Sequence, residues 1–393
     1  MKIFKEKIQE ILNKAVETVY PSKQELEKVL MSGKRLRIYN GIDPTGKLHL
    51  GHLVVLKKLR QFQDLGHEII ILIGGFTATI GDPTGKNSVR KPLTEKQILE
   101  NAKDYKLQIG KVLNLKKTNV KFLNNKKWLG KLKADEILKI ASYFTVARLL
   151  ERDMFQKRIQ EGREIFLHEF LYPIFQAYDS VAMDVDLEIG GSDQIFNMLA
   201  GRTLMGKMKQ KEKFVLATKL LTDPEGKKMG KSESNLIPLN EKPDQIFGKI
   251  MSWPDELIKI GFELLTDFSK KEINEVLIKT TPRNAKARLA KEIVSTCYNK
   301  EIAKKAEEEF IRVFKEKKLP TKIPEVKIEN SFINILDLLV KTNLASSKSN
   351  AKRLVLQKGV KIDGEIQLDW KKNIQIKKGT TIQVGKRKAV KIN

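Results

Sequence analysis

The order of predicted elements in residues 36–75 constrains the fold more than any other feature. Residues 36–43 (LRIYNGID) form a short apolar run that ends in a turn, and residues 67–75 (HEIIILIGG) form a second, β-branched run. Runs of this length and composition predict strands rather than buried helices. The segment between them predicts a helix that begins near Leu50. Strand, helix and strand in this order open an α/β fold with a parallel sheet.

The rest of the chain extends this start into several domains. Residues 187–194 and 213–221 predict further strands, whereas residues 88–185 are mostly helical in pattern. A chain of 393 residues is longer than one compact domain usually is. We therefore predict a Rossmann-like catalytic domain at residues 1–237 with a helical insertion at about 115–190, a helical domain at 238–316, a proline-containing linker at 317–331, and a small α+β domain at 332–393.

Net charge points to the class of partner. The formal charge is +27, from 75 Lys and Arg against 48 Asp and Glu. Such an excess favours a polyanion, either nucleic acid or an anionic membrane surface, although a lysine-rich solvated surface is the simpler alternative. Residues 331–393 hold 14 basic and 4 acidic residues, which gives about +10. The small C-terminal domain therefore carries a disproportionate share of the excess.

Other features bound the compartment and the cofactors. The single cysteine, Cys297, excludes an intramolecular disulfide and a cysteine-based zinc site. No apolar run approaches the roughly 20 residues that a membrane span needs. The first 20 residues lack a signal-peptide core, and their apolar residues, which end with Val16, recur at helical spacing. We expect a cytoplasmic protein with no membrane association.

The motif HLGH, residues 49–52, is the sharpest local feature. It follows the first predicted strand and opens the helix, so both imidazoles lie in the first helical turn. Helix N-termini attract phosphate through their unpaired N–H groups and partial positive charge. Imidazole donors there would stabilise charge that develops on a nucleotide. Two incidental histidines, or half of a metal site, are the alternatives, and the strand–turn–helix context favours phosphate chemistry.

Two glycine-containing loops carry lysines. GIDPTGK (41–47) mimics a phosphate loop, but Leu48 stands where that motif needs Ser or Thr for magnesium, so a tight Asp-Pro turn is the better interpretation. KKMGKS (227–232) places Lys228 and Lys231 on a flexible loop that would close on a polyphosphate. An ordinary basic surface loop is the alternative for the second motif.

Polar side chains interrupt a predicted amphipathic helix. Tyr172, Gln176 and Asp179 share one helix face, where apolar residues would usually be buried. A phenol, an amide and a carboxylate together suit a small polar ligand such as an amino acid, and a purely structural hydrogen-bond network is the equal alternative. The turn GGSDQ (190–194) follows a strand, at the sheet edge where α/β folds bind ligands.

Taken in order, these segments resemble a class I aminoacyl-tRNA synthetase. HLGH is similar to the HIGH signature of that class, and KMGKS to its KMSKS loop, with Gly230 in place of serine. YNGIDPTGKLHLGHL, GGFTATIGDPTGK, FLYPIFQAYD and LEIGGSDQ resemble blocks of the bacterial-type tyrosyl-tRNA synthetases. The tail, from SSKSNAKRLVLQKGVKIDG to TTIQVGKRK, resembles the S4 RNA-binding domain at the C-terminus of that family. Tryptophanyl enzymes share the fold but usually lack that tail and a Tyr39/Asp179 pair.

The resemblance implies a ligand-binding role for particular side chains of this chain. For L-tyrosine these are Tyr39 and Asp179 at the phenolic hydroxyl, Asp82, Tyr172 and Gln176 at the α-ammonium group, and Gln194 at the carboxylate. For ATP they are Asp43, Thr45, Gly51, Gly191, Asp193, Met229 and Lys231.

The resemblance also implies catalytic and RNA-binding groups. His49 and His52 would meet the phosphates, and four cations would grip pyrophosphate in the transition state, namely Lys86, Arg90, Lys228 and Lys231. The helical domain at 238–316 would recognise the anticodon region of the tRNA. Four cations of the C-terminal domain would bind RNA: Lys348, Lys352, Arg353 and Lys358. No protein-bound structural metal is expected, and Mg²⁺ would accompany the ATP phosphates.

The implied activity is that of a tyrosine–tRNA ligase, which forms tyrosyl-adenylate from L-tyrosine and ATP and charges tRNA(Tyr). A homodimer is also implied, with its interface in the inserted helical region, whose apolar residues include Ile137, Leu138, Ile140, Phe144, Leu149 and Leu150. The alternative is that those residues fill the core of the monomer. Competing functions are a tryptophanyl enzyme, a small-molecule adenylyltransferase and a non-catalytic RNA-binding protein.

Overall fold

The computed structural model describes most of the chain as two compact units. The described residues are 2–82, 94–229, 236–314, 316, 323–328, 332–385 and 388–393. One unit comprises Met1–Lys242 with Lys249–Asn299, and the other comprises Pro243–Gly248 with Lys300–Asn393. Within the described ranges, no helix has the length and apolar composition needed to cross a membrane.

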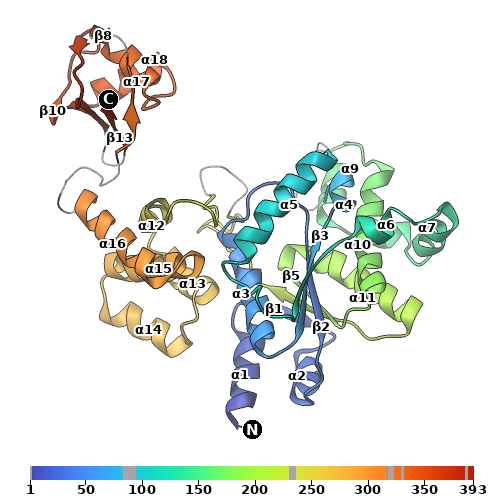
Figure 1. Ribbon diagram of the computed structural model, residues 1–393. Coiled ribbons are helices and arrows are strands. Elements are labelled where there is room, and N and C mark those ends of the chain that lie inside the picture. Colours follow the sequence, from blue (N-terminus) through green and yellow to red (C-terminus); the bar gives the residue numbers. More distant parts are fainter. Residues whose placement is uncertain are drawn as a thin grey trace. The chain divides into compact units, whose positions relative to one another are not determined.

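A six-stranded sheet forms the centre of the first unit (Figure 1). Its order is β1-β6-β5-β2-β3-β4, and every neighbouring pair is parallel except β1 with β6. Strands β3, β5 and β6 are almost entirely buried, as expected where helices cover a parallel sheet, and β2 is buried at three of its six residues. The strands are β1 (Val16–Tyr20), β2 (Arg37–Ile42), β3 (Glu68–Ile73), β4 (Val120–Asn124), β5 (Leu187–Gly191) and β6 (Phe214–Thr218). The predicted α/β class with a parallel sheet is confirmed.

Helices pack on this sheet through apolar faces. Helix α3 packs on β3 and β5, α11 packs on β5 and β6, and α10 lies along α11. The helices are α1 (Lys2–Asn13), α2 (Lys23–Met31), α3 (Leu50–Asp64), α4 (Thr77–Ile80), α5 (Glu95–Ile109), α6 (Lys126–Leu129), α7 (Ala134–Ala141), α8 (Val146–Leu150), α9 (Asp153–Gln160), α10 (Leu167–Met183) and α11 (Ile195–Lys209), with the short 3₁₀ helix η1 (Ser192–Gln194) before α11.

Charged helices follow the sheet along the chain. Caps set their starts: Ser269 and Glu272 form a capping box, and Pro282 stands at the first position of its helix after the cap Thr281. Cys297 is buried at the end of one of them and is free. The helices are α12 (Pro243–Met251), α13 (Leu257–Leu265), α14 (Lys270–Lys279), α15 (Pro282–Cys297) and α16 (Lys300–Phe314).

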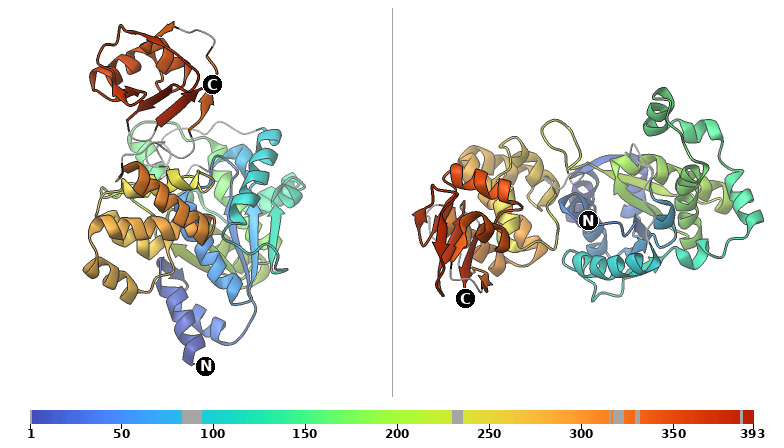
Figure 2. Two further views of the ribbon diagram at one scale, coloured as in Figure 1. Left: turned by 60° about the vertical axis from the view of Figure 1, so that its left-hand side comes forward. Right: turned by 90° about the horizontal axis from the view of Figure 1, so that it is seen from above.

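The C-terminal segment has a core of its own. Its two helices pack against each other. Its short strands, drawn in red in Figure 2, enclose an apolar cluster that includes Leu338, Val355 and Ile382. A five-stranded sheet has the order β10-β9-β12-β13-β7, and β11 pairs with β8. The elements are β7 (Glu325–Val326), β8 (Phe332–Asn334), α17 (Ile335–Lys341), α18 (Lys348–Leu356), β9 (Val360–Ile362), β10 (Glu365–Ile366), β11 (Asn373–Gln375), β12 (Thr381–Val384) and β13 (Lys388–Ile392).

Local structure departs from the sequence-based expectation at four places. The helix expected from the N-terminus ends at Asn13, and Val16 belongs to β1, because Ala15 adopts a positive φ of 55° that ends the helical path. Strand β4 lies inside the stretch expected to be mostly helical; it is an edge strand with no fully buried residue, so its pattern is weak. Strand β7 lies within the expected linker, and β8 precedes the helix expected from residue 332.

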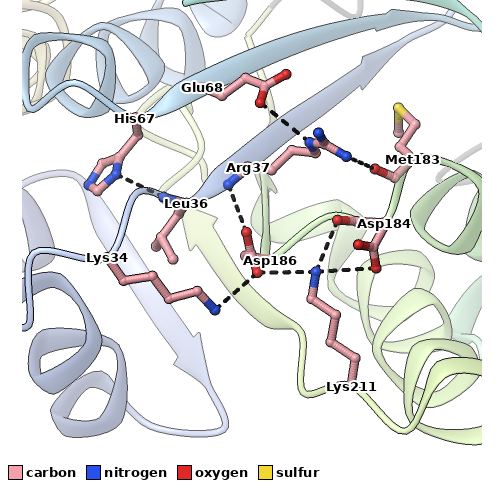
Figure 3. Close-up of polar contacts among 9 residues, drawn as sticks. All are labelled: Lys34, Leu36, Arg37, His67, Glu68, Met183, Asp184, Asp186 and Lys211. Carbon is pink, nitrogen blue, oxygen red and sulfur yellow. Dashed lines mark hydrogen bonds and ion pairs between the residues drawn. The ribbon is translucent and has the colours of Figure 1, made fainter.

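Charged side chains join the amino-terminal ends of the central strands (Figure 3). One oxygen of Asp186, directly before β5, accepts a hydrogen bond of 2.8 Å from the Arg37 backbone N–H. Its other oxygen lies 3.4 Å from Lys34 Nζ and 3.2 Å from Lys211 Nζ. Burial acts to raise the pKa of Asp186, but these donors outweigh burial and lower it. The carboxylate therefore stabilises the folded state while it is ionised.

Replacing Asp186 with asparagine should lower the free energy of unfolding by about 1–3 kcal/mol at pH 7, because a charged acceptor shared by three donors is lost. Asp184→Asn is the matched control: the Asp184 side chain is exposed and pairs with the same Lys211, so its change should stay within about 0.5 kcal/mol. Urea unfolding measures both variants.

The same difference should depend on pH with a definite sign. Because the folded protein has the lower pKa at Asp186, the stabilisation is present above the ordinary carboxyl pKa and is lost as the pH falls through the folded-state value. Wild type and Asp186→Asn should therefore converge in acid. Equal stabilities at pH 7 would contradict the role assigned to Asp186.

Candidate active site

The two histidines of HLGH are bonded to the backbone at the start of α3. His49 is the N-cap, and its Nδ1 accepts a hydrogen bond of 3.1 Å from the Gly51 N–H. His52 Nδ1 accepts one of 3.2 Å from the His49 N–H, and the two ring centroids are 4.1 Å apart. A neutral imidazole that accepts at Nδ1 carries its proton at Nε2. Each ring therefore offers one Nε2–H donor.

Burial keeps both imidazoles neutral. It lowers the pKa of His49 to about 4, with a further contribution from the charge of Lys228. Burial also lowers the pKa of His52 well below its ordinary value, assisted by His49 and Lys228. The pair acts near pH 7 as two neutral hydrogen-bond donors rather than as cations.

The KMGKS segment begins beside this helix start. Lys228 Nζ lies 2.7 Å from Asp193 Oδ2, and the Met229 N–H donates to the Leu221 carbonyl at 2.8 Å. A Cβ on Gly51 would lie 2.9 Å from His49 Cε1 and 3.8 Å from the Met229 carbonyl oxygen, so Gly51 leaves room for the first ring close to the loop. Lys231 lies outside the described residues, as do Lys86 and Arg90.

Asp43, directly after β2, receives two hydroxyl donors. Tyr172 Oη donates to Asp43 Oδ2 at 2.9 Å, and Thr77 Oγ1 donates to Asp43 Oδ1 at 2.9 Å. The Thr45 N–H closes the turn by donating to the Asp43 carbonyl at 2.8 Å. Burial, followed by the charges of Asp43 and Asp82, raises the pKa of Tyr172 well above its ordinary value. Asp43 thus connects the end of β2 to the start of α4 through Thr77 and to α10 through Tyr172.

Asp82 is the centre of a second polar group. Its Oδ2 accepts a hydrogen bond of 2.9 Å from Gln194 Nε2, and its Oδ1 lies 3.9 Å from a guanidinium nitrogen of Arg152. Asn197 Nδ2 donates to Gln194 Oε1 at 2.9 Å, which sets the orientation of that amide. Asp82 and Asp43 both act on Tyr172, so the two polar groups adjoin.

The third polar group is deeply buried. Asp179, on α10, accepts hydrogen bonds from Trp128 Nε1 at 2.7 Å and from Asn125 Nδ2 at 3.2 Å. Burial raises the pKa of Asp179 well above its ordinary value, although these two donors act in the opposite direction. Tyr39, on β2, is fully buried, and its Oη lies 3.0 Å from Ser180 Oγ. Tyr39 and Asp179 interact electrostatically, so a phenol and a carboxyl group occur together in the interior, between β2 and α10.

Gln176 is bonded to a buried ion pair that Ser180 joins to this group. Its Nε2 donates to Glu188 Oε1 at 3.1 Å, and the other oxygen of Glu188 pairs with Lys213. Lys213 Nζ also donates to Ser180 Oγ at 2.9 Å.

The predicted site residues fall into two places. The structure brings the described ligand and phosphate candidates together at the carboxyl ends of β2 and β5 and on α10, with Gly191 ending β5 and Asp193 following it. The predicted RNA-binding cations lie in the second unit, on α18 and in the turn after it. Among the described residues, no group of three His, Cys, Asp or Glu side chains is placed to hold a metal ion.

Sequence analysis missed the residues that hold the buried polar groups: Asn125, Trp128, Arg152, Glu188 and Lys213. A signal existed for two of them. Glu188 interrupts the apolar strand β5, and Lys213 stands directly before the apolar strand β6. A charge next to a buried strand requires a buried partner. Asn125 and Trp128 had no comparable signal, because they belong to a loop and a short helix.

Comparisons with known proteins cover almost the entire chain. A family model described as class I tRNA synthetases (W and Y) matches residues 31–315, and a tyrosine–tRNA ligase SYY-like C-terminal domain matches residues 315–388. The tyrosine–tRNA ligase of Carboxydothermus hydrogenoformans is 45% identical over 98% of this chain and 97% of its own length. That of Thermotoga maritima is 45% identical over 98% of this chain and 96% of its own length.

Solved structures share the fold. A C-terminally truncated mitochondrial tyrosyl-tRNA synthetase of Aspergillus nidulans superposes with a TM-score of 0.66 at 22% identity, over 79% of this chain and 94% of its own. The tyrosyl-tRNA synthetase of Archaeoglobus fulgidus, complexed with L-tyrosine, gives a TM-score of 0.60 at 23% identity, over 77% of this chain and 99% of its own.

The pKa of about 4 at His49 predicts a pH-dependent stability. Unfolded histidine has a pKa near 6.5, so the unfolded chain binds a proton between pH 6.5 and 4 that the folded protein does not bind. The free energy of unfolding therefore keeps its full value, as far as His49 is concerned, above pH 6.5, and it decreases as the pH falls toward 4.

Asn is also a good N-cap, so His49→Asn should keep the helix start and remove this dependence. The free energy of unfolding of wild type should fall by up to about 3 kcal/mol more than that of the variant between pH 7 and pH 4. Urea unfolding at several pH values measures the difference. Parallel pH profiles for the two proteins would show that His49 is not held neutral.

Proposed function

This chain belongs to the tyrosine–tRNA ligases, a family of class I aminoacyl-tRNA synthetases, and on that premise we propose how its residues act. The reaction joins L-tyrosine to ATP as tyrosyl-adenylate, releases pyrophosphate, and then transfers tyrosine to the 3′ end of tRNA(Tyr). The identity of 45% along 98% of the chain carries this assignment. A cytoplasmic location follows as part of the proposal.

Tyrosine recognition is assigned to the three polar groups. Asp179 would accept a hydrogen bond from the substrate's phenolic hydroxyl, because Asn125 and Trp128 leave its oxygens further capacity to accept. Tyr39 would donate to the phenolic oxygen. A phenylalanine substrate would leave these buried groups unpaired, and tyrosine enzymes of this family are the standard illustration of that argument. Asp82, Tyr172 and Gln176 would surround the α-ammonium group, with Gln194 at the carboxylate.

Adenylate formation needs positioning more than proton transfer. The tyrosine carboxylate is already a nucleophile and attacks the α-phosphate of ATP in line, so no general base is required. His49 and His52 would donate hydrogen bonds from Nε2 to the phosphates. Because both imidazoles are neutral, they can do so without a change of protonation state. Lys228 would exchange Asp193 for the departing pyrophosphate, together with Lys86, Arg90 and Lys231.

The nucleotide would lie over the glycine-bordered edge of the sheet. Gly51 and Gly191 lack side chains at the helix start and at the end of β5, and a Cβ on Gly191 would meet Asp193 Oδ1 at 2.6 Å. Asp43, Thr45 and Met229 complete the proposed ATP site. The carboxylates here are already engaged, so we propose that Mg²⁺ enters with ATP and shields its phosphates.

We propose residues 332–393 as an RNA-binding domain that follows the catalytic and helical domains at 1–237 and 238–316 and the linker at 317–331. Its net charge of about +10 suits a phosphate backbone. Lys348 pairs with Asp337 at 2.6 Å, and Lys352 Nζ lies 4.0 Å from the centre of the Trp370 ring. Both lysines are exposed, as are Arg353 and Lys358.

A homodimer is proposed from exposed apolar side chains. Ile140 and Leu149, expected at an interface, are instead buried in the subunit's own core. Leu138 and Leu167 are 71% and 78% exposed, and Val146, Ile159 and Phe166 are exposed as well. Apolar exposure concentrated in one inserted region is typical of a protein–protein interface.

Tryptophan is the competing substrate, because the family model covers both enzymes. Pyrophosphate exchange with each of the twenty amino acids tests the assignment. Exchange with tyrosine alone supports the proposed function, and exchange with tryptophan, or with none, refutes it.

Asp179→Ala should lower kcat/KM for tyrosine in pyrophosphate exchange by a factor on the order of 100, because a buried acceptor is lost. The KM for ATP should change little. Asp369→Ala, at an exposed carboxylate of the C-terminal segment, is the control and should leave exchange as in wild type. Unchanged tyrosine kinetics in folded Asp179→Ala would show that the pocket is elsewhere.

Light scattering should give a molar mass of twice the 45.0 kDa chain. Leu167→Glu should shift the mass toward one chain, because it buries an unpaired charge in the interface. Ile278→Glu replaces a side chain that is 83% exposed on α14 and should leave the dimer intact. A wild-type mass of one chain, or a Leu167→Glu variant that stays dimeric, would exclude this interface.

A further inference from the structure

A fully buried lysine lies behind the phenol pocket and has no part in the reaction as proposed. Lys213 Nζ pairs with the Glu188 carboxylate and donates to Ser180 Oγ at 2.9 Å and to the Met198 carbonyl at 3.1 Å. Glu188 is also buried. Removing two charges from water is costly, and a pair of well-packed apolar residues is often at least as stable. Folding stability alone therefore does not explain why this ion pair is buried.

A glycine keeps the space for this pair open. Gly201 lies inside α11, where glycine is less favourable than alanine. A Cβ at this position would collide with Lys213 Nζ, would lie 2.7 Å from Ser180 Oγ, and would lie 3.5 Å from Glu188 Oε2. The helix thus accommodates the ammonium, the hydroxyl and the carboxylate together.

Counting donors gives the direction of the hydrogen bonds. Among the residues that the structure describes, the Ser180 hydroxyl is bonded to Lys213 Nζ and to Tyr39 Oη. An ammonium group only donates, so Ser180 Oγ accepts from Lys213 and its own single proton is available for Tyr39 Oη. Tyr39 Oη then accepts from Ser180, and the Tyr39 proton remains for a third group.

Glu188 is the competing acceptor for that proton. Burial, followed by the charge of Glu188, raises the pKa of Tyr39, so the phenol stays protonated. A side-chain hydrogen bond between Tyr39 and Glu188 adds to this shift, which puts the Tyr39 proton within reach of that carboxylate. One oxygen of Glu188 already receives Gln176 Nε2, and the other already receives Lys213. Lys213 neutralises the carboxylate and so weakens its attraction for the Tyr39 proton.

We propose that Lys213 and Glu188 are positioning residues for substrate specificity, which act through Ser180 to make Tyr39 a hydrogen-bond donor toward the substrate's phenolic oxygen. The inference rests on the proposed function, because it requires Tyr39 and Asp179 at the substrate hydroxyl. Two directed hydrogen bonds then meet the substrate: one is donated by Tyr39, and one is accepted by Asp179. Phenylalanine can make neither.

The test is the ratio of kcat/KM for tyrosine to kcat/KM for phenylalanine in pyrophosphate exchange. Ser180→Ala should lower this ratio about 10-fold, because Tyr39 loses the donor that orients its proton. Lys213→Met should lower it at least as much. The KM for ATP should stay as in wild type. A merely structural defect would lower both activities together and leave the ratio unchanged.

A double-mutant cycle with Tyr39→Phe separates positioning from direct contact. Since Ser180 and Lys213 act through the Tyr39 hydroxyl, neither substitution should lower the ratio further in a Tyr39→Phe background. Lys207→Met, at an exposed lysine on α11, is the matched control and should leave the ratio at the wild-type value.

The outcomes distinguish two failures. If Tyr39→Phe itself leaves the ratio unchanged, the phenol pocket of the proposed function is wrong, and this inference falls with it. If Tyr39→Phe lowers the ratio but folded Ser180→Ala does not, the pocket stands and the positioning inference is overturned. Effects that multiply in the Tyr39→Phe background also overturn it. Should Lys213→Met fail to fold, Ser180→Ala still decides.

Discussion

The parallel pairing of β2 with β3 and β5 is the constraint on which the rest of the structure depends. Parallel strands end at one common edge, so the residues that follow them converge there although they are far apart in the chain. Asp43 follows β2, and Asp193 follows β5. The same register places the start of α3, with His49 as its N-cap, beside them. Helix α10 then needs only to lie along α11 for Tyr172 to reach Asp43.

Charge is handled in opposite ways beside the sheet and in the interior. Beside the amino-terminal ends of the strands, Asp186 and its lysines are accessible enough to water to be ion pairs of ordinary stabilising value. In the interior, Asp179 and the pair of Lys213 with Glu188 are desolvated, so each charge requires specific donors or acceptors. Desolvation strengthens a directed hydrogen bond and makes an unpaired group costly. The proposed recognition of the substrate uses the buried groups for that reason.

Sequence patterns predicted the elements that carry strong local signals. Sequence analysis placed three elements within one or two residues of their bounds: the strand at Arg37–Ile42, the helix from Leu50 and the strand at Glu68–Ile73. A strand buried on both faces shows a continuous apolar run, and a helix buried on one face shows a clear apolar period. Strand β4 was missed since its residues are mostly partly buried and do not alternate between buried and exposed positions. The roles of the site residues stay predictions, including those of Lys86, Arg90 and Lys231, which lie outside the described residues.

The sequence by itself determined the fold class, the family and the ordered motifs, because each of these is written in short segments whose residue types and spacing are readable locally. Only the tertiary structure decided which polar groups are hydrogen-bonded to each other. Tyr39 and Ser180 are 141 positions apart, and Lys213 is 33 from Ser180, so nothing local links them. Hydrogen bonds act over about 3 Å. A separation in the chain becomes a contact of that length only after the sheet and α10 have packed.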